Sequence, residues 1–206
     1  MEEHEYKASF YDKISQLYPL YEKVKLAILL AENFDEKQEL YIAPINQLRS
    51  ALDHIFKSVC AANENGSCDY ELKEAKEHME RSGYDALELL VSGLGAGIVE
   101  KLKVYDTETL TVVFPKYYEE IKPTITEIRQ SVAKRRMERK TDTDKSFFAY
   151  FDEIMVLVDI NKAVDKKIPS LHDYSKKKKK EKRRGRFLEI IIGIILAIVG
   201  FLLGKI

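Results

Sequence analysis

The chain has 206 residues and no net charge at neutral pH, because 34 basic side chains balance 34 acidic ones. This length is sufficient for one domain with a single core and a short extra element. This balance does not suggest a generic nucleic-acid-binding protein, and any contact with RNA would need a local basic patch. Two cysteines, Cys60 and Cys68, are too few for a disulfide scaffold, so we expect free thiols. We expect no signal peptide, because no basic segment followed by an apolar one opens the chain.

Apolar residues spaced alternately by four and three positions predict two amphipathic helices in the first third of the chain. The first helix runs from Phe10 to Ile28 and the second from Tyr41 to Val59, and turn-forming residues 63–67 follow. The stripe that we expect to face the core in the second helix consists of Tyr41, Ile45, Leu48, Leu52, Ile55 and Val59.

A third helix is predicted from Asp69 to Leu90. Three glycines follow it, at Gly93, Gly95 and Gly97. Because they come after a helix and not after a strand, they indicate a helix break or hinge in place of a nucleotide-binding loop. The residues of this helix that we expect in the core are Leu72, Ala75, Met79, Ala86 and Leu90.

The region after these glycines is predicted to contain two more helices. Residues 103–114 are compatible with a short strand, although no partner strand is visible. A fourth helix covers residues 117–140, and a fifth begins after cap residues 141–144 and is ended by Pro169. These elements predict an all-α fold, an antiparallel bundle of about five helices that occupies residues 1–169.

Residues 170–186 are predicted to be a linker that ends in a basic collar. The last 31 residues contain 10 of the 34 basic residues and 2 of the 34 acidic ones, so they carry a net charge of +8 and the rest of the chain carries −8. Such a collar suits a membrane with anionic lipids. The collar consists of Lys176, Lys177, Lys178, Lys179, Lys180, Lys182, Arg183, Arg184 and Arg186.

Residues 187–206 are predicted to form one C-terminal transmembrane helix. The stretch Ile190–Gly204 has no polar side chain, and residues 187–206 would extend about 30 Å as a helix, roughly one hydrocarbon thickness. A helix lying in the membrane plane is the alternative, but it needs a polar face. The positive-inside rule then predicts a tail-anchored, single-pass membrane protein whose N-terminal domain is cytoplasmic.

Small residues recur on one face of this C-terminal segment. They permit two membrane helices to approach closely, which predicts a homo-oligomer. The four positions are Gly193, Ala197, Gly200 and Gly204.

The candidate catalytic residues lie on the second and third helices. Arg49 and His54 are five positions apart, so they point about 140° apart around their helix. His78, Arg81 and Asp85 lie within about 60° on one face of the third helix, and we expect them to support the pair. The two helices form a hairpin, so both groups can meet. A salt-bridge network that ties the helices together is the alternative interpretation.

The spacing of Arg49 and His54, an Arg-x4-His motif, resembles that of the HEPN superfamily. The resemblance implies an all-α bundle and, as in many members, a metal-independent ribonuclease whose site forms across a dimer interface. It implies Arg49 and His54 as the catalytic pair, with His54 as general acid or base and Arg49 stabilising charge on the phosphate. A HEPN-like bundle with a membrane helix also resembles membrane accessory proteins of type VI CRISPR systems.

We therefore consider three functions. The first is a self-associating, membrane-anchored effector or accessory factor in bacterial antiphage defence. The second is a membrane-tethered ribonuclease, and the third is a scaffold without enzymatic activity that binds a protein partner. RNA or protein is a possible partner. No cofactor is expected, and no metal site is proposed because His4 and His172 are isolated from other metal-ligating residues.

Overall fold

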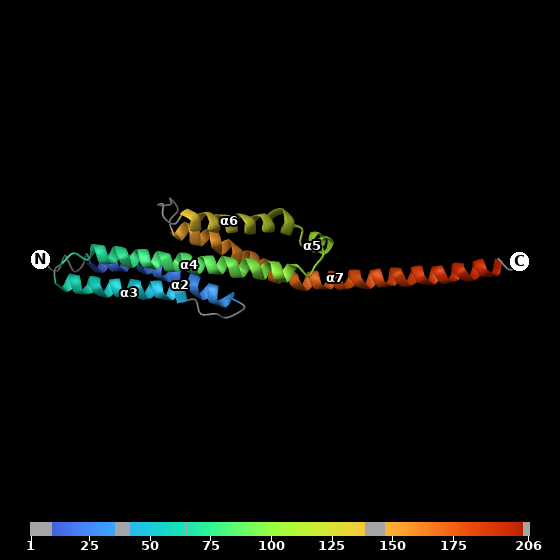
Figure 1. Cartoon of the computed structure of the whole chain (residues 1–206), viewed down its shortest axis with the longest axis horizontal. Helices are drawn as coiled ribbons and strands as arrows, with labels where there is room; N and C mark the ends of the chain where they lie inside the picture. The colour runs from blue at the N-terminus through green and yellow to red at the C-terminus, as the bar shows by residue number, and fades with distance from the viewer. Residues whose placement is uncertain (1–9, 36–41, 65, 139–146, 204–206) are drawn as a thin grey trace.

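The computed structural model describes residues 10–35, 42–64, 66–138 and 147–203. These residues form a bundle of helices, which confirms the predicted all-helical bundle, and a short helical segment over residues 10–15 precedes the first labelled helix (Figure 1). The elements are α2 (Tyr18–Asn33), α3 (Ile42–Asn63), α4 (Asp69–Leu102), α5 (Thr107–Val113), the π-helical turn η1 (Tyr117–Ile121), α6 (Lys122–Glu138) and α7 (Phe147–Leu203).

Helix α4 is the centre of the bundle, since it packs against α2, α3, α6 and α7. Its buried residues recur every three or four positions, which is the pattern of a helix with one face in the core. All five residues of this helix that the sequence placed in the core are buried, which confirms this part of the prediction. The helix also continues without a break through Gly93, Gly95 and Gly97, so the predicted break or hinge is wrong.

The predicted core stripe of α3 is right only in part, since Leu48, Ile55 and Val59 pack partly buried against the core but the most buried face is offset from the stripe. Its buried residues are Pro44, Ala51, Ser58 and Ala62, whereas Leu52 remains 49% exposed. Small residues on this face permit close contact with α4, where the Ser82 hydroxyl donates to the Pro44 carbonyl oxygen at 2.8 Å. The large apolar residues therefore lie toward the margin of the contact. Tyr41, the first residue of the predicted stripe, lies outside the described residues.

The segment that was compatible with a strand is the helix α5. Asp106 is its N-cap, and the Asp106 side chain accepts a hydrogen bond from the backbone N–H of Thr109 at 2.8 Å. This cap satisfies one backbone donor at the start of the helix, which favours a helix over an unpaired strand. The helix packs against α7 and connects α4 to the second half of the bundle.

Helix α7 is continuous over 57 residues. It includes Pro169, which was predicted to end the fifth helix, and residues 170–186, which were predicted to be a linker. Pro169 lies inside it, although proline removes one backbone hydrogen bond from a helix. Val164 and Leu171, on either side of Pro169, are fully buried, so packing in the core offsets this cost. The C-terminal part of α7 then extends alone beyond the other helices (Figure 1).

The predicted transmembrane helix over residues 187–206 is wrong, because no helix in the described ranges is long and apolar enough to cross a membrane. The apolar stretch of α7 begins only after Glu189, and the described helix ends at Leu203. The helix from Ile190 to Leu203 extends about 21 Å, which is shorter than the roughly 30 Å of bilayer hydrocarbon. The prediction of a single-pass membrane protein with a cytoplasmic N-terminal domain depends on that helix and is therefore wrong as well.

Candidate functional site

Two histidines meet where α3 packs against α4. His54 comes from α3 and His78 from α4, and their rings are stacked with centroids 5.3 Å apart and an interplanar angle of 20°. His54 Nδ1 lies 2.7 Å from Glu71 Oε2, and both side chains are mostly shielded from solvent, at 18% and 23% exposure. The two predicted groups of residues, one on each helix, therefore come into contact through His54 and His78.

His78 is positioned by a residue of the opposite helix. Its Nδ1 lies 2.7 Å from Gln47 Oε1 of α3. Burial lowers the pKa of His78 below its usual value, and the nearby charges of Arg81 and His54 act in the same direction. Glu74 and Glu77 oppose this effect. The lowered pKa favours the neutral imidazole near neutral pH, in which one ring nitrogen keeps a free lone pair.

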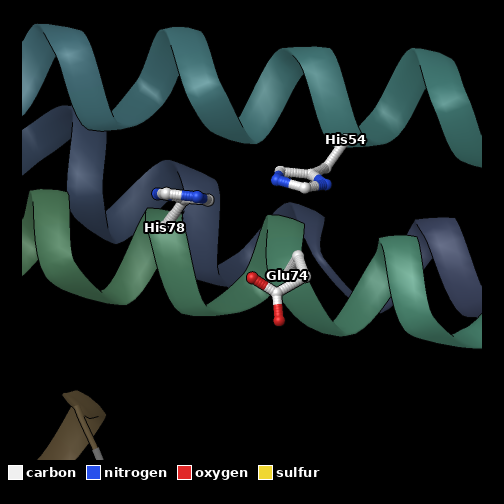
Figure 2. Close-up of side chains that lie close together, drawn as sticks. All are labelled: His54, Glu74 and His78. Atoms are coloured by element: carbon white, nitrogen blue, oxygen red, sulfur yellow. The ribbon is translucent and has the colours of Figure 1, made fainter.

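Glu74 completes a cluster of three groups that are able to ligate a metal. It lies one helical turn before His78 on α4, so the two side chains share a face. One ring nitrogen of His54, one of His78 and one carboxylate oxygen of Glu74 all lie within 4.8 Å of one another. Figure 2 shows the His54 side chain directed from α3 toward α4, which carries the other two.

Sequence reasoning missed Glu74 as a site residue. The available signal was the four-residue spacing of Glu74 and His78 within a helix that pairs with the helix of His54. Gln47 and Glu71, which orient the two rings, gave no signal in the sequence. Only the isolated His4 and His172 were considered as metal ligands in the sequence, and neither of them predicts this cluster.

The structure gives Arg49 and His54 different neighbours. Arg49 is an exposed residue of α3 that lines a groove of about 720 Å³ between α2 and α3, and His54 is not among the described residues that line this groove. The groove is mainly apolar, with Tyr18, Tyr21 and Leu52 in its wall. Within one chain, Arg49 thus lies at the groove, whereas His54 lies at the contact between α3 and α4.

Arg81, one of the residues expected to support the catalytic pair, forms an ion pair within α4. Arg81 Nη2 lies 2.8 Å from Glu77 Oε2, one turn toward the start of the helix, whereas Asp85 lies one turn toward its end. Glu77 also pairs with Lys73 at 3.7 Å. These pairs are exposed and make a small contribution to stability.

The basic collar lies on the part of α7 that leaves the bundle. Lys178 is its contact with the bundle, since Lys178 Nζ lies 2.8 Å from Asp106 Oδ2 and 2.6 Å from Glu108 Oε2. Among the described residues, none of the other eight collar side chains makes an ion pair. Every residue from 179 to 200 is exposed.

Comparisons with protein-family models, with curated proteins and with solved structures find no match to this chain. The resemblance to the HEPN superfamily therefore stays a prediction from the Arg-x4-His motif.

Proposed function

We propose that the protein is an accessory factor that binds the surface of an anionic membrane through the C-terminal end of α7, without crossing the bilayer. One observation carries this proposal. On a single continuous helix, a collar of nine basic residues directly precedes an apolar end that no other part of the described chain covers. We expect the collar to bind lipid headgroups and the apolar end, which has no polar face, to insert into the hydrocarbon beneath them without spanning it.

The apolar end gives a reason to bind lipid. Its large side chains are 37% to 66% exposed, and covering each one contributes on the order of 1 kcal/mol. Exposed apolar surface of this extent on a soluble domain marks an interaction site. These side chains belong to Phe187, Leu188, Ile190, Ile191, Ile192, Ile194, Ile195, Leu196, Ile198 and Val199.

The charge distribution gives a reason to select anionic lipid. Lys178 is held by Asp106 and Glu108, which leaves the rest of the collar available to headgroups. Each basic residue near an anionic surface contributes about 1 kcal/mol. The remainder of the chain carries −8 and is repelled by the same surface. The bundle is thereby presented away from the membrane.

In this proposal the bundle provides the contact with a protein partner. The groove between α2 and α3 offers an apolar surface with one cationic residue, Arg49. The ribonuclease activity and the antiphage role stay predictions from the HEPN resemblance. Cleavage of RNA by the full chain, abolished by His54→Ala, would support the enzyme in place of the accessory factor.

Vesicle flotation of the full chain tests the proposal. We expect the protein to float with vesicles that contain phosphatidylserine and to float weakly with pure phosphatidylcholine. Reversing three collar charges, in Lys180→Glu/Arg183→Glu/Arg184→Glu, is expected to reduce binding to anionic vesicles at least about 100-fold, since each charge contributes about 1 kcal/mol. Flotation distinguishes bound protein from self-associated protein, which stays at the bottom of the gradient.

The matched control reverses three exposed lysines away from the collar, in Lys25→Glu/Lys166→Glu/Lys167→Glu. It changes the net charge equally and should retain binding to anionic vesicles. Equal flotation with neutral and anionic vesicles, or equal loss in both triple variants, contradicts a collar that recognises anionic lipid.

A further inference from the structure

We infer that His54, Glu74 and His78 form a binding site for a divalent first-row transition metal, with zinc as the best fit, that links α3 to α4. The site is independent of the proposed lipid contact, because it lies within the bundle. Its three side chains place one ligand atom each within 4.8 Å of the other two. A tetrahedral zinc ion needs its ligand atoms about 3.4 Å apart, so small side-chain rotations suffice.

The hydrogen bonds of both rings engage Nδ1 and leave Nε2 available to a ligand. Glu71 Oε2 and Gln47 Oε1 only accept hydrogen bonds, so Nδ1 of His54 and Nδ1 of His78 are the donors at 2.7 Å. In a neutral imidazole, Nε2 then carries the lone pair that binds a metal. Histidines that ligate metals commonly donate their other ring N–H to a carboxylate or an amide oxygen in this way.

The third group is a carboxylate that lacks a cationic partner. Among the described residues Glu74 makes no ion pair, whereas Glu77 is paired with Arg81 and Lys73, and Glu80 with Lys76. Glu74 is also partly buried, where a carboxylate benefits from a nearby cation. A metal ion between the two rings would supply that positive charge.

The set of ligands points to zinc more than to magnesium or calcium. Two imidazoles and one carboxylate suit zinc and its neighbours in the first transition row, whereas magnesium and calcium prefer oxygen ligands only. Three protein ligands leave a fourth position of a tetrahedral site for water. Because one ligand comes from α3 and two from α4, the ion would connect the two helices.

Metal titration of the purified full chain tests the site. The background carries His4→Ala and Cys60→Ser, which remove a histidine in the undescribed N-terminal region and the exposed thiol. After treatment with a chelator, Co²⁺ is added as a spectroscopic probe and then displaced by Zn²⁺. We expect one equivalent of Co²⁺ to give the visible bands of a tetrahedral site and Zn²⁺ to abolish them.

The variants separate ligands from residues that orient them. His54→Ala and His78→Ala should abolish the cobalt bands, and Glu74→Gln should weaken binding strongly. Glu71→Gln, which changes only the partner of His54, should weaken binding about 10-fold to 100-fold. His172→Ala, at an exposed histidine of α7, is the matched control and should bind as the background does. Circular dichroism establishes that each variant is folded.

Two results would overturn the inference. One is the absence of tetrahedral cobalt bands in the folded background protein. The other is binding that does not distinguish the ligands from the control, being either unchanged in both His54→Ala and His78→Ala or lost equally in His172→Ala. A rise of the melting temperature on adding Zn²⁺ in the background, absent in folded His78→Ala, provides a second readout that does not depend on spectroscopy.

Discussion

At the scale of single residues, two buried side-chain hydroxyls lack a hydrogen-bond partner within the described part of the chain, those of Thr109 and Tyr150, and the Tyr150 ring also faces a cation. Tyr150 is 1% exposed, and its buried hydroxyl has no hydrogen-bond partner among the described residues. The guanidinium of Arg135 lies 4.3 Å from the centroid of the Tyr150 ring and 4.7 Å from that of Tyr84. The aromatic ring of Tyr150 therefore makes a cation–π contact, whereas its hydroxyl makes no hydrogen bond with the described residues.

We predict that Tyr150→Phe raises the free energy of unfolding by about 1 kcal/mol, because an unsatisfied buried hydroxyl is removed while the ring is kept. Tyr84→Phe is the matched control. Tyr84 is only partly buried and its hydroxyl is not among the buried atoms that lack a partner, so its removal should leave the free energy of unfolding within about 0.5 kcal/mol of the native value. Urea unfolding followed by circular dichroism measures both changes. Destabilisation by Tyr150→Phe would show that the hydroxyl has a partner in solution.

At the scale of secondary-structure elements, one carboxylate joins α5 to α7. Asp106 caps α5 through the backbone N–H of Thr109 and pairs with Lys178 of α7. Hydrogen bonds from Lys178 and Thr109 hold the pKa of Asp106 well below its usual value. Because the folded-state pKa is lowered, the stabilisation is present above the unfolded value of about 3.9 and is lost as pH falls through the folded value.

We predict an order of melting temperatures at neutral pH in which the native chain exceeds Asp106→Asn, which in turn exceeds Asp106→Ala. Asparagine retains the cap but loses the ion pair with Lys178, and alanine loses both. The difference between the native chain and Asp106→Asn should shrink as pH falls below about 4. Thermal melts across this acid range measure it. A difference that is independent of pH would rule out the ion pair as its cause.

The element scale also shows where sequence reasoning succeeds and where it fails. The core face of α4 was predictable because its buried residues follow the helical repeat, as at Leu72 and Leu90. The core face of α3 was predictable only in part, because periodicity favours large residues such as Leu52, whereas Ala51 and Ser58 permit the closer contact with α4. How closely two helix backbones pack depends on the residues of both helices, so the apolar pattern of α3 alone does not predict it.

Packing also outweighed two residues that favour a helix break, Gly95 and Pro169. Gly95 lies inside α4 against the Arg129 guanidinium, where an added Cβ would approach Arg129 Nη2 to 2.6 Å. This glycine provides room for a neighbouring side chain, which sequence alone does not distinguish from a hinge. Pro169 similarly lies in a helix whose contacts extend on both sides of it. For the candidate site, the meeting of His54 and His78 followed from the hairpin, whereas Glu74 was overlooked although its four-residue spacing from His78 places both on one face of α4.

At the scale of the whole molecule, charge and apolar surface are separated along the long axis. The acidic bundle lies at one end, and the uncovered apolar part of α7 extends from the other (Figure 1). In water the apolar end lowers its free energy only by contact with another apolar surface. When lipid is absent, the most available such surface is the same segment of another copy.

We therefore predict that the full chain self-associates through the ends of α7 in buffer without lipid, and that anionic vesicles compete with this association. In a single chain, a Cβ added at Gly193 or Gly200 meets no atom within 4 Å, so a substitution there leaves the packing of the chain itself unchanged. Any effect on association must then come from contact between copies, where small residues permit helices to approach closely.

The variant Gly193→Leu/Gly200→Leu should raise the dissociation constant at least about 10-fold, since a loss of 1.4 kcal/mol of contact energy has that effect. Ile194→Leu/Ile198→Leu exchanges exposed side chains of equal size on another face and should associate as the native chain does. Sedimentation velocity over a range of concentrations measures all three proteins. If the native chain is monomeric, or if both double variants weaken association equally, the glycine face is not the contact between copies. The flotation experiment then decides whether lipid alone covers the end of α7.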